Sequence, residues 1–202
     1  MAEEAVIRER FAPIFQKLGA LVGAARDAFN RHSAASLEEL KKLHGELAAD
    51  LKNSLDAVDQ ILAKAPDIQR ASLVRWQSIL IHLQVLTETL AGLAAPIGRK
   101  AKEGILFSDK AVAQANHLFD QAAGILRSLL DTIKTDNDFL KRYVIEESQK
   151  LVHNCNEFAT EHEARLIEGL CLPQAAPLFL ALLDGMRTLG QYGVNIGRIL
   201  AQ

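Results

Sequence analysis

The feature of this sequence that most constrains its fold is an apolar periodicity of three and four residues, which returns in six successive segments. This spacing places the apolar side chains of each segment on one face of an α-helix. The cleanest stripe consists of Val112, Ala115, Phe119, Ala122, Leu126, Leu129 and Ile133. No segment alternates every second residue as a strand does. The sequence therefore predicts an all-α protein.

Capping residues and prolines set the expected ends of the helices. Ser36 followed by Glu39 has the pattern of a capping box, in which each side chain satisfies an amide at a helix start. Ser108 or Asp109, and the cluster 136–138, are further N-cap candidates. Pro66 ends one helix, because proline disfavours helix in the residue before it. The six expected starts lie near residues 4, 36, 71, 109, 136 and 175.

The second three starts follow the first three by about 100 residues, which indicates an internal duplication. A helix of about 27 residues is about 40 Å long. Six such helices joined by short turns must lie antiparallel to bury their apolar stripes. We therefore predict two tandem antiparallel three-helix bundle repeats, residues 1–103 and 104–202.

Composition and charge exclude several classes of protein. The chain has 202 residues, with 23 Lys and Arg against 25 Asp and Glu, so no basic excess exists to neutralise the phosphates of a nucleic acid. The longest apolar stretch, Ala175 to Leu183, contains Pro177 and falls short of the about 20 residues of a spanning helix. The amino terminus does not resemble a secretory signal. We expect a cytoplasmic protein that meets membranes only through a partner.

Signatures of catalysis and of di-iron chemistry are missing from the sequence. None of the six histidines has a glutamate three residues before it, as the di-iron bundles require. Gly-rich phosphate loops, HExxH and GxSxG are absent as well. Cys155 and Cys171 are sixteen positions apart, and we expect both to be reduced, buried and inert. The sequence predicts that the protein is not an enzyme.

The helix expected to begin near residue 136 carries the best-aligned candidate ligands. Glu146, His153, Glu157, Glu161 and Glu168 fall within about 100 degrees of one another. A solvated acidic face is the simpler interpretation, and a metal site is the alternative. His44 and His162 lie on or beside apolar stripes and are expected to be core or rim residues with hydrogen-bond partners.

The last helix presents an unusual stripe of glycines. Gly190, Gly193 and Gly197 follow one another on successive turns of one face. Each glycine inside a helix costs roughly 0.5 to 1 kcal/mol relative to alanine, so the stripe calls for a compensation. Close approach of another helix backbone is the physical candidate. A weak helix end near the carboxyl terminus is the alternative.

Residues 161–201, EHEARLIEGLCLPQAAPLFLALLDGMRTLGQYGVNIGRILA, resemble the closing helix pair of PhoU-like domains, especially those attached to bacterial sodium/phosphate cotransporters. Leu189, Gly190, Asn195 and Ile196 stand at places that match the last helix of that family, which gives a helix-packing motif of Gly190, Gly193, Asn195 and Gly197. The segment KEGILFSDKA, from Lys102, is similar to the link between the two halves. The resemblance implies two three-helix repeats and a regulatory role in phosphate transport or in the histidine-kinase signalling tied to it.

The resemblance also implies metal clusters held by Glu/Asp-x-x-x-Asp pairs, and there the sequence departs from the family. The pair on the last helix falls on Arg187 and Gln191, and the pair on the third helix falls on Gln84 and Glu88. Only Glu157 and Glu161 keep an acidic pair of the kind seen on the middle helices of the family. In the first half, the second helix offers Asp56 and Asp59 at a different spacing, with Glu46 and Asp50 further back. We expect no resident cofactor, and at most a weak, substoichiometric metal at Glu157 and Glu161.

The sequence leaves three functions open. The first is a non-enzymatic regulatory or adaptor protein that contacts a phosphate transporter or sensor kinase component. The second is a metal-binding helical bundle, motivated by the acidic face. The third is a structural helical module that oligomerises, for which a homodimer is the simplest form.

Overall fold

The computed structural model describes the backbone of residues 2–202 and the side chains from Val6 onward. Within this range the chain is helical and contains no strand, which confirms the predicted all-α fold. The elements are α1 (Ala2–Glu9), α2 (Phe11–Arg31), α3 (Ala34–Leu62), α4 (Asp67–Gly92), α5 (Ala94–Glu103), α6 (Asp109–Thr135), α7 (Asp138–Ile167), the short 3-10 helix η1 (Pro173–Ala175) and α8 (Ala176–Leu200).

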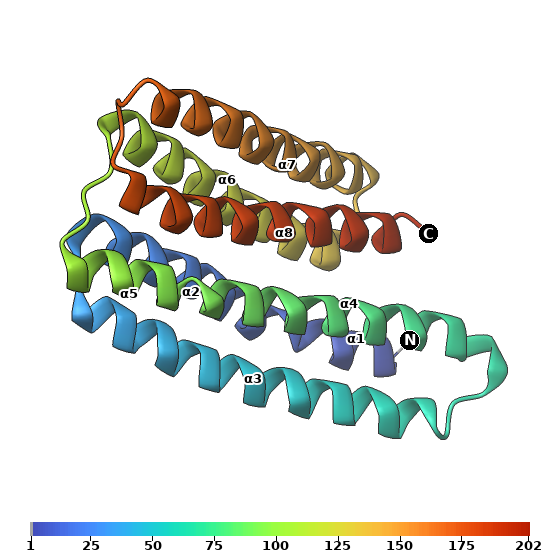
Figure 1. Cartoon of the computed structure of the whole chain (residues 1–202). Coiled ribbons are helices and arrows are strands. Elements are labelled where there is room, and N and C mark those ends of the chain that lie inside the picture. The colour runs from blue at the N-terminus through green and yellow to red at the C-terminus, as the bar shows by residue number, and fades with distance from the viewer. Residues whose placement is uncertain (1) are drawn as a thin grey trace.

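The helices form two groups of three long rods that lie side by side (Figure 1). In the first group α1 continues into α2 and α4 continues into α5, while α6, α7 and α8 form the second group. Residues 104–108 connect the groups. The two groups meet where α2 packs against α6 and α4 against α8, which leaves α3 and α7 at the outer edges.

The observed helix starts correct several expected boundaries. Ser33, not Ser36, caps α3, because its hydroxyl accepts the Ser36 amide at 3.1 Å. Helix α4 begins directly after Pro66 rather than near residue 71, with Pro66 extended at its N-cap and the acidic Asp67 favourably placed in its first turn. The single helix expected over residues 4–31 is two helices that meet at Arg10.

Two other predicted caps are confirmed. The Ser108 hydroxyl accepts the Ala111 amide at 3.4 Å at the start of α6. The Asn137 side chain accepts the amides of Phe139 and Leu140, at 2.8 and 3.2 Å, at the start of α7. These bonds satisfy amides that have no partner within their own helices.

One hydrophobic core runs through both groups. Its largest fully buried side chains include Phe11 and Phe29 of α2, Phe119 of α6 and Phe179 of α8. Phe107, in the connecting segment, contacts both Phe29 and Phe179, with ring centroids 5.4 and 5.9 Å apart. The two groups therefore share a core and form one packed body.

The combined segment α4–α5, Asp67–Glu103, is long and apolar enough to cross a membrane by length and composition alone. Buried residues make up 39% of its most apolar window, with a mean hydropathy of 1.4. The core helix of a helical bundle meets the same criteria, and α4 packs against α2, α3 and α8 here.

Candidate functional site

The three glycines of α8 lie directly against α7, and we call this contact the glycine seam. A methyl group on Gly190 would lie 2.8 Å from the backbone oxygen of Ser148, and one on Gly193 would overlap the Ser148 hydroxyl. A methyl group on Gly197 would lie 2.7 Å from Ile145. Side chains at these positions would therefore push the two helices apart. Gly190 therefore has its compensation in close packing against the α7 backbone, and Gly193 and Gly197 have theirs in close packing against neighbouring side chains.

Asn195 does not take part in the seam, although the sequence motif groups it with the glycines. It is exposed, whereas Gly193 and Gly197 are buried. The reason is helical geometry, because a residue two positions from another lies about 200 degrees around the helix. The structure thus separates the motif into a buried part, which packs, and an exposed part, which is available for contact.

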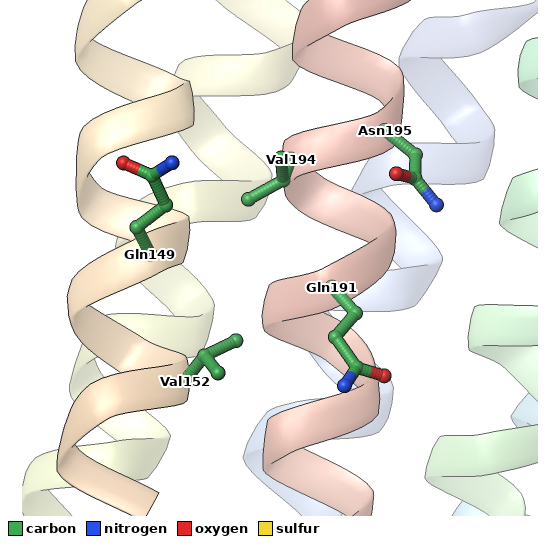
Figure 2. Close-up of a pocket in the computed structure, with 5 residues that line it drawn as sticks. All are labelled: Gln149, Val152, Gln191, Val194 and Asn195. Atoms are coloured by element: carbon green, nitrogen blue, oxygen red, sulfur yellow. The ribbon is translucent and has the colours of Figure 1, made fainter.

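Asn195 lines a shallow groove on the outer side of the α7–α8 pair (Figure 2). The groove has a volume of about 250 Å³ and is lined by Gln149, Val152, Gln191, Val194 and Asn195. Val152 and Val194 point toward each other between the two helices, while the amides lie around them (Figure 2). No charged side chain belongs to this lining, so the groove suits a neutral, partly apolar partner surface.

The acidic pair Glu157 and Glu161 does not form an open metal site. Glu161 accepts a hydrogen bond from the Gln114 amide at 2.8 Å and lies 3.3 Å from the Lys110 ammonium. Arg165 adds a second cation at 3.5 Å. Glu157 is exposed, one helical turn away. The cations of Lys110 and Arg165 therefore already lie beside the Glu161 carboxylate.

The acidic pair of the first group is neutralised in the same way. Lys17 of α2 lies 3.2 Å from Glu46 and 2.8 Å from Asp50, both on α3. The hydrogen bond to Asp50 is the largest cause that raises the pKa of Lys17. In each group, a lysine of the preceding long helix binds an acidic residue of the middle helix.

The described residues offer no metal centre elsewhere. No group of three or more His, Cys, Asp or Glu side chains within residues 6–202 is arranged to hold an ion. Glu146, His153 and Glu168, the other residues of the predicted acidic face, are exposed. The residues present therefore do not fit the carboxylate clusters that the family resemblance implies.

The positions where the resemblance would place further carboxylates make other contacts. Glu88 of α4 bonds the ring of His44 on α3 at 2.9 Å. Arg187 donates to Asn156 at 2.9 Å and also bonds Asp184 on its own helix. Gln84 and Gln191 are exposed. The outer side of α4 and α8 is thus a surface of amides and paired charges.

His162 behaves differently from His44. It is 2% exposed, and neither ring nitrogen has a hydrogen-bond partner among the described residues. The expectation of a partner is therefore wrong for His162, because its ring packs on Phe179, with centroids 4.8 Å apart. Burial, with a smaller effect of the Arg165 charge, lowers the pKa of His162. The ring is neutral at pH 7.

The two thiols differ in environment. Cys155 is buried, and burial raises the pKa of its thiol to about 12, so that it is protonated and unreactive. Cys171 lies in the turn between α7 and α8 and is only partly buried, which corrects the expectation that both are buried. The turn that carries Cys171 lies at the end of the bundle (Figure 1).

The end of the bundle near Cys171 exposes an apolar surface that sequence reasoning did not single out. We define it as the apolar end patch, with exposed fractions between 52% and 81% for Leu106, Ile167, Leu170 and Leu172. Ile105 of the connecting segment packs with Ala175 and Leu178 beneath it. A signal was available, because the turn Leu170–Pro173 is apolar where turns are usually polar.

Comparisons with known proteins find the fold but no close relative. No family model and no curated protein matches the sequence. The crystal structure of PhoU from Pseudomonas aeruginosa matches with a TM-score of 0.89 and 14% identity, over 98% of this chain and 95% of that chain. The phosphate transport system regulatory protein PhoU from Streptococcus pneumoniae matches with a TM-score of 0.86 and 13% identity, over 99% and 94%. The chain has the fold of the PhoU proteins along nearly its whole length.

Proposed function

We propose that this protein is a non-enzymatic, cytoplasmic regulator of phosphate transport or phosphate signalling that acts by contact with other proteins. The observation that carries the proposal is the similarity in fold to two PhoU proteins, one of them described as a phosphate transport system regulatory protein. The similarity covers nearly all of each chain.

The residues that carry the sequence resemblance support the same proposal. Leu189 and Ile196 are fully buried, and Gly190 packs against α7. They maintain the α7–α8 pair and are not available for chemistry. Two side chains with reactive groups are also unsuited to chemistry, because the Cys155 thiol stays protonated and His162 is buried away from solvent. We therefore place the function of the protein on its surface, where it contacts other proteins.

The apolar end patch is the surface we propose for the contact with a transporter or sensor kinase component. Soluble proteins seldom expose contiguous large apolar side chains unless the surface binds something. The patch combines two turns that the shared core holds together, so a partner would meet a preformed surface. The membrane is reached only through that partner.

Affinity purification from the native cells tests the proposal. The tagged wild-type protein should recover a phosphate transporter or sensor kinase component, and the double variant Ile167→Asp, Leu170→Asp should lose it. Phe139→Asp is a matched control, because Phe139 is a comparably exposed apolar residue at the opposite end of α7. Wild-type protein that recovers neither class of partner would overturn the function, whereas retention by the double variant would overturn only the assignment of the patch.

No observation on the described residues favours a metal-binding bundle over this function. The acidic pairs already hold lysine or arginine side chains, as described above. An oligomerising module remains compatible with the regulatory role, since one surface can bind a partner while another binds a second copy.

A further inference from the structure

Lys100 brings a positive charge into the interior of the protein in the last turn of α5. The residue is 5% exposed. Its ammonium group donates a hydrogen bond to the backbone oxygen of Phe29, close to the C-terminal end of α2, at 2.8 Å, and a second one to Nε2 of His32. Burial lowers the pKa of Lys100, and no carboxylate of the described residues offsets that effect. A carbonyl oxygen and an imidazole therefore hold this cation in place of an acid.

Two aromatic rings enclose the same ammonium group. Its nitrogen lies 4.8 Å from the ring centroid of Phe29 and 5.6 Å from that of Phe107. The face of an aromatic ring attracts a cation, and it does so more strongly when the cation is removed from water. Phe107 belongs to the connecting segment, residues 104–108. The charge of Lys100 therefore helps to hold the connecting segment against α2.

The connecting segment also forms part of the apolar end patch. Ile105 is buried against Ala175 and Leu178, and Phe107 is half-buried, whereas Leu106 between them is exposed and belongs to the patch. The connecting segment and the α7–α8 turn, which carries the rest of the patch, lie at the same end of the bundle (Figure 1). A change that releases Phe107 would therefore also move Leu106 relative to that turn.

His32 is the part of this arrangement that responds to protons. It follows α2 with a φ of 52° and is only half-buried, so water reaches its ring. An ammonium group can only donate hydrogen bonds, so the Nε2 atom of His32 accepts and the ring is neutral. A protonated ring carries a hydrogen on both nitrogens and cannot accept. Two positive charges would then lie in contact.

We propose that the hydrogen bond between Lys100 and His32 is a proton-sensitive latch that regulates the apolar end patch. With a neutral His32 ring, the ammonium group stays between Phe29 and Phe107 and the connecting segment is fixed. With a protonated ring, the two cations repel each other, the ammonium group moves away from Phe107, and the segment loosens. The patch then loses the fixed position of Leu106. This regulation rests on the proposed function, which places the partner contact on the patch.

Lys100 is the charged group that acts on His32. Burial, and after it the charge of Lys100, lowers the pKa of His32. Apolar side chains line the small cavity beside Lys100, from α2, α5, the connecting segment and α8: Phe29, Pro96, Ile97, Phe107, Leu178 and Leu182. Charged side chains on the helices packed around the latch pair with one another at exposed positions, as in Arg31–Asp27 of α2, Lys41–Glu38 and Lys42–Glu39 of α3, and Arg99–Glu103 of α5.

His162 is a second titratable ring at this end of the bundle. It packs on Phe179, which in turn contacts Phe107, and burial, with the Arg165 charge, lowers its pKa as well. An experiment on the latch must therefore separate the proton taken up by His32 from the one taken up by His162.

Hydrogen exchange of the full chain tests the latch in the absence of a partner. The amides of Gly104 and Ile105 both donate to the backbone oxygen of Lys100. After correction for the intrinsic effect of pH on exchange, their protection should fall by about threefold or more between pH 7.5 and pH 5.5, with a limit of about tenfold per pH unit for one proton. Amides in the centre of α6 should keep their protection, which excludes global unfolding as the cause.

Three variants identify the responsible group. His32→Gln supplies an uncharged acceptor and should keep the protection at both pH values. Lys100→Met removes the second cation and should also abolish the dependence on pH. His162→Phe is the matched control and should lose protection as the wild-type protein does. Wild-type protection that does not change with pH would overturn the proposal, as would an undiminished loss in His32→Gln or a loss abolished by His162→Phe.

Affinity purification at the two pH values tests the link to partner binding. Wild-type protein should recover less of its partner at pH 5.5 than at pH 7.5, whereas His32→Gln should recover equal amounts. Equal recovery by the wild-type protein would overturn the regulation of the patch and leave the proposed function intact. Failure to recover a partner at pH 7.5 would instead overturn the proposed function and with it the regulatory role, even where hydrogen exchange shows that the latch itself opens.

Discussion

The α7–α8 pair and the α3–α4 pair occupy equivalent positions in the two groups, but they pack by different means. Helix α8 brings its glycines against the backbone and side chains of α7, with no space for a methyl group at Gly190 or Gly193. In the α3–α4 pair the glycines, Gly45 and Gly92, have open space around them. Leucines make up most of the buried residues of α3 and of α4, including Leu40, Leu47, Leu51, Leu83, Leu86 and Leu90.

This difference determines how the two helix pairs tolerate substitution. A leucine contact tolerates exchange with other aliphatic side chains of similar volume. At Gly190 the α7 backbone lies too close to α8 for any added side chain. The same physical reason predicts that the two helix pairs respond in opposite ways to added side chains.

The largest expected effect comes from Gly193→Leu. The new side chain would have to displace Ser148 and Ile125, and we expect a loss of about 3 kcal/mol or more in the free energy of unfolding, at the upper end of overpacking costs. Gly45→Leu is the control, because Gly45 is exposed and meets nothing within 4 Å. Urea unfolding of both variants checks the prediction, and equal midpoints would show that the glycine seam is not tight.

Substitution of glycine by alanine should change the stability in opposite directions in the two helix pairs. Gly190→Ala should destabilise the protein by about 1 kcal/mol or more, because its methyl group would lie 2.8 Å from a backbone oxygen that cannot rotate away. Gly45→Ala should stabilise it by roughly 0.5 to 1 kcal/mol, since alanine is the better helix former. Thermal unfolding of the two variants decides the matter, and a shift of the same sign in both would contradict it.

Much of the fold could be predicted from the sequence, because helical periodicity and caps are local signals. The Ser108 and Asn137 caps are in the expected places, and the six apolar stripes correspond to the six long helical rods. The Ser36 prediction failed because Ser33, just three residues earlier, offers the same hydroxyl. The break at Arg10 escaped notice, since the apolar stripe continues through it from Ile7 to Phe11.

The candidate site could be predicted only in part, because its properties arise between elements distant in sequence. The carboxylates Glu157 and Glu161 can be recognised in the sequence, but the Lys110 ammonium and the Gln114 amide that bind Glu161 come from another helix. The apolar end patch likewise joins Leu106 to a turn more than 60 positions later. Spacing along the sequence gives the face of one helix and does not reveal what the next helix places opposite it.

A pH-dependent difference between the groups is expected from His162. Burial lowers its pKa in the folded state below the ordinary value of 6.5, so the unfolded chain takes up a proton first as the pH falls. The stabilising contribution of the neutral ring is complete above pH 6.5 and is lost as the pH falls through the folded-state pKa. The slope is at most about 1.4 kcal/mol per pH unit.

Urea unfolding at pH 7.5 and pH 5 measures this effect. His162→Phe should remove part of the loss of stability at low pH, because phenylalanine can pack on Phe179 without taking up a proton. His32 has its pKa lowered as well, by burial and by the Lys100 charge, so some dependence should remain. An unchanged profile in His162→Phe would refute the role of this ring.

The smallest expected effect concerns the lysine and arginine side chains that bind the two acidic pairs. Lys17→Ala should cost about 0 to 1 kcal/mol, because the Lys17 pairs with Glu46 and Asp50 are about one-third exposed. It should not create a strong metal site, since hard cations need six or more oxygen ligands and this pair offers two carboxylates. Lys110 and Arg165 place the same limit on Glu157 and Glu161 in the second group.

Elemental analysis of wild-type protein purified without chelator should therefore find less than one iron or zinc atom per chain after extended dialysis. A full atom that survives dialysis and disappears in Glu157→Gln would show that the second group holds metal despite its paired cations, and the two groups would then differ in ion binding as well as in packing.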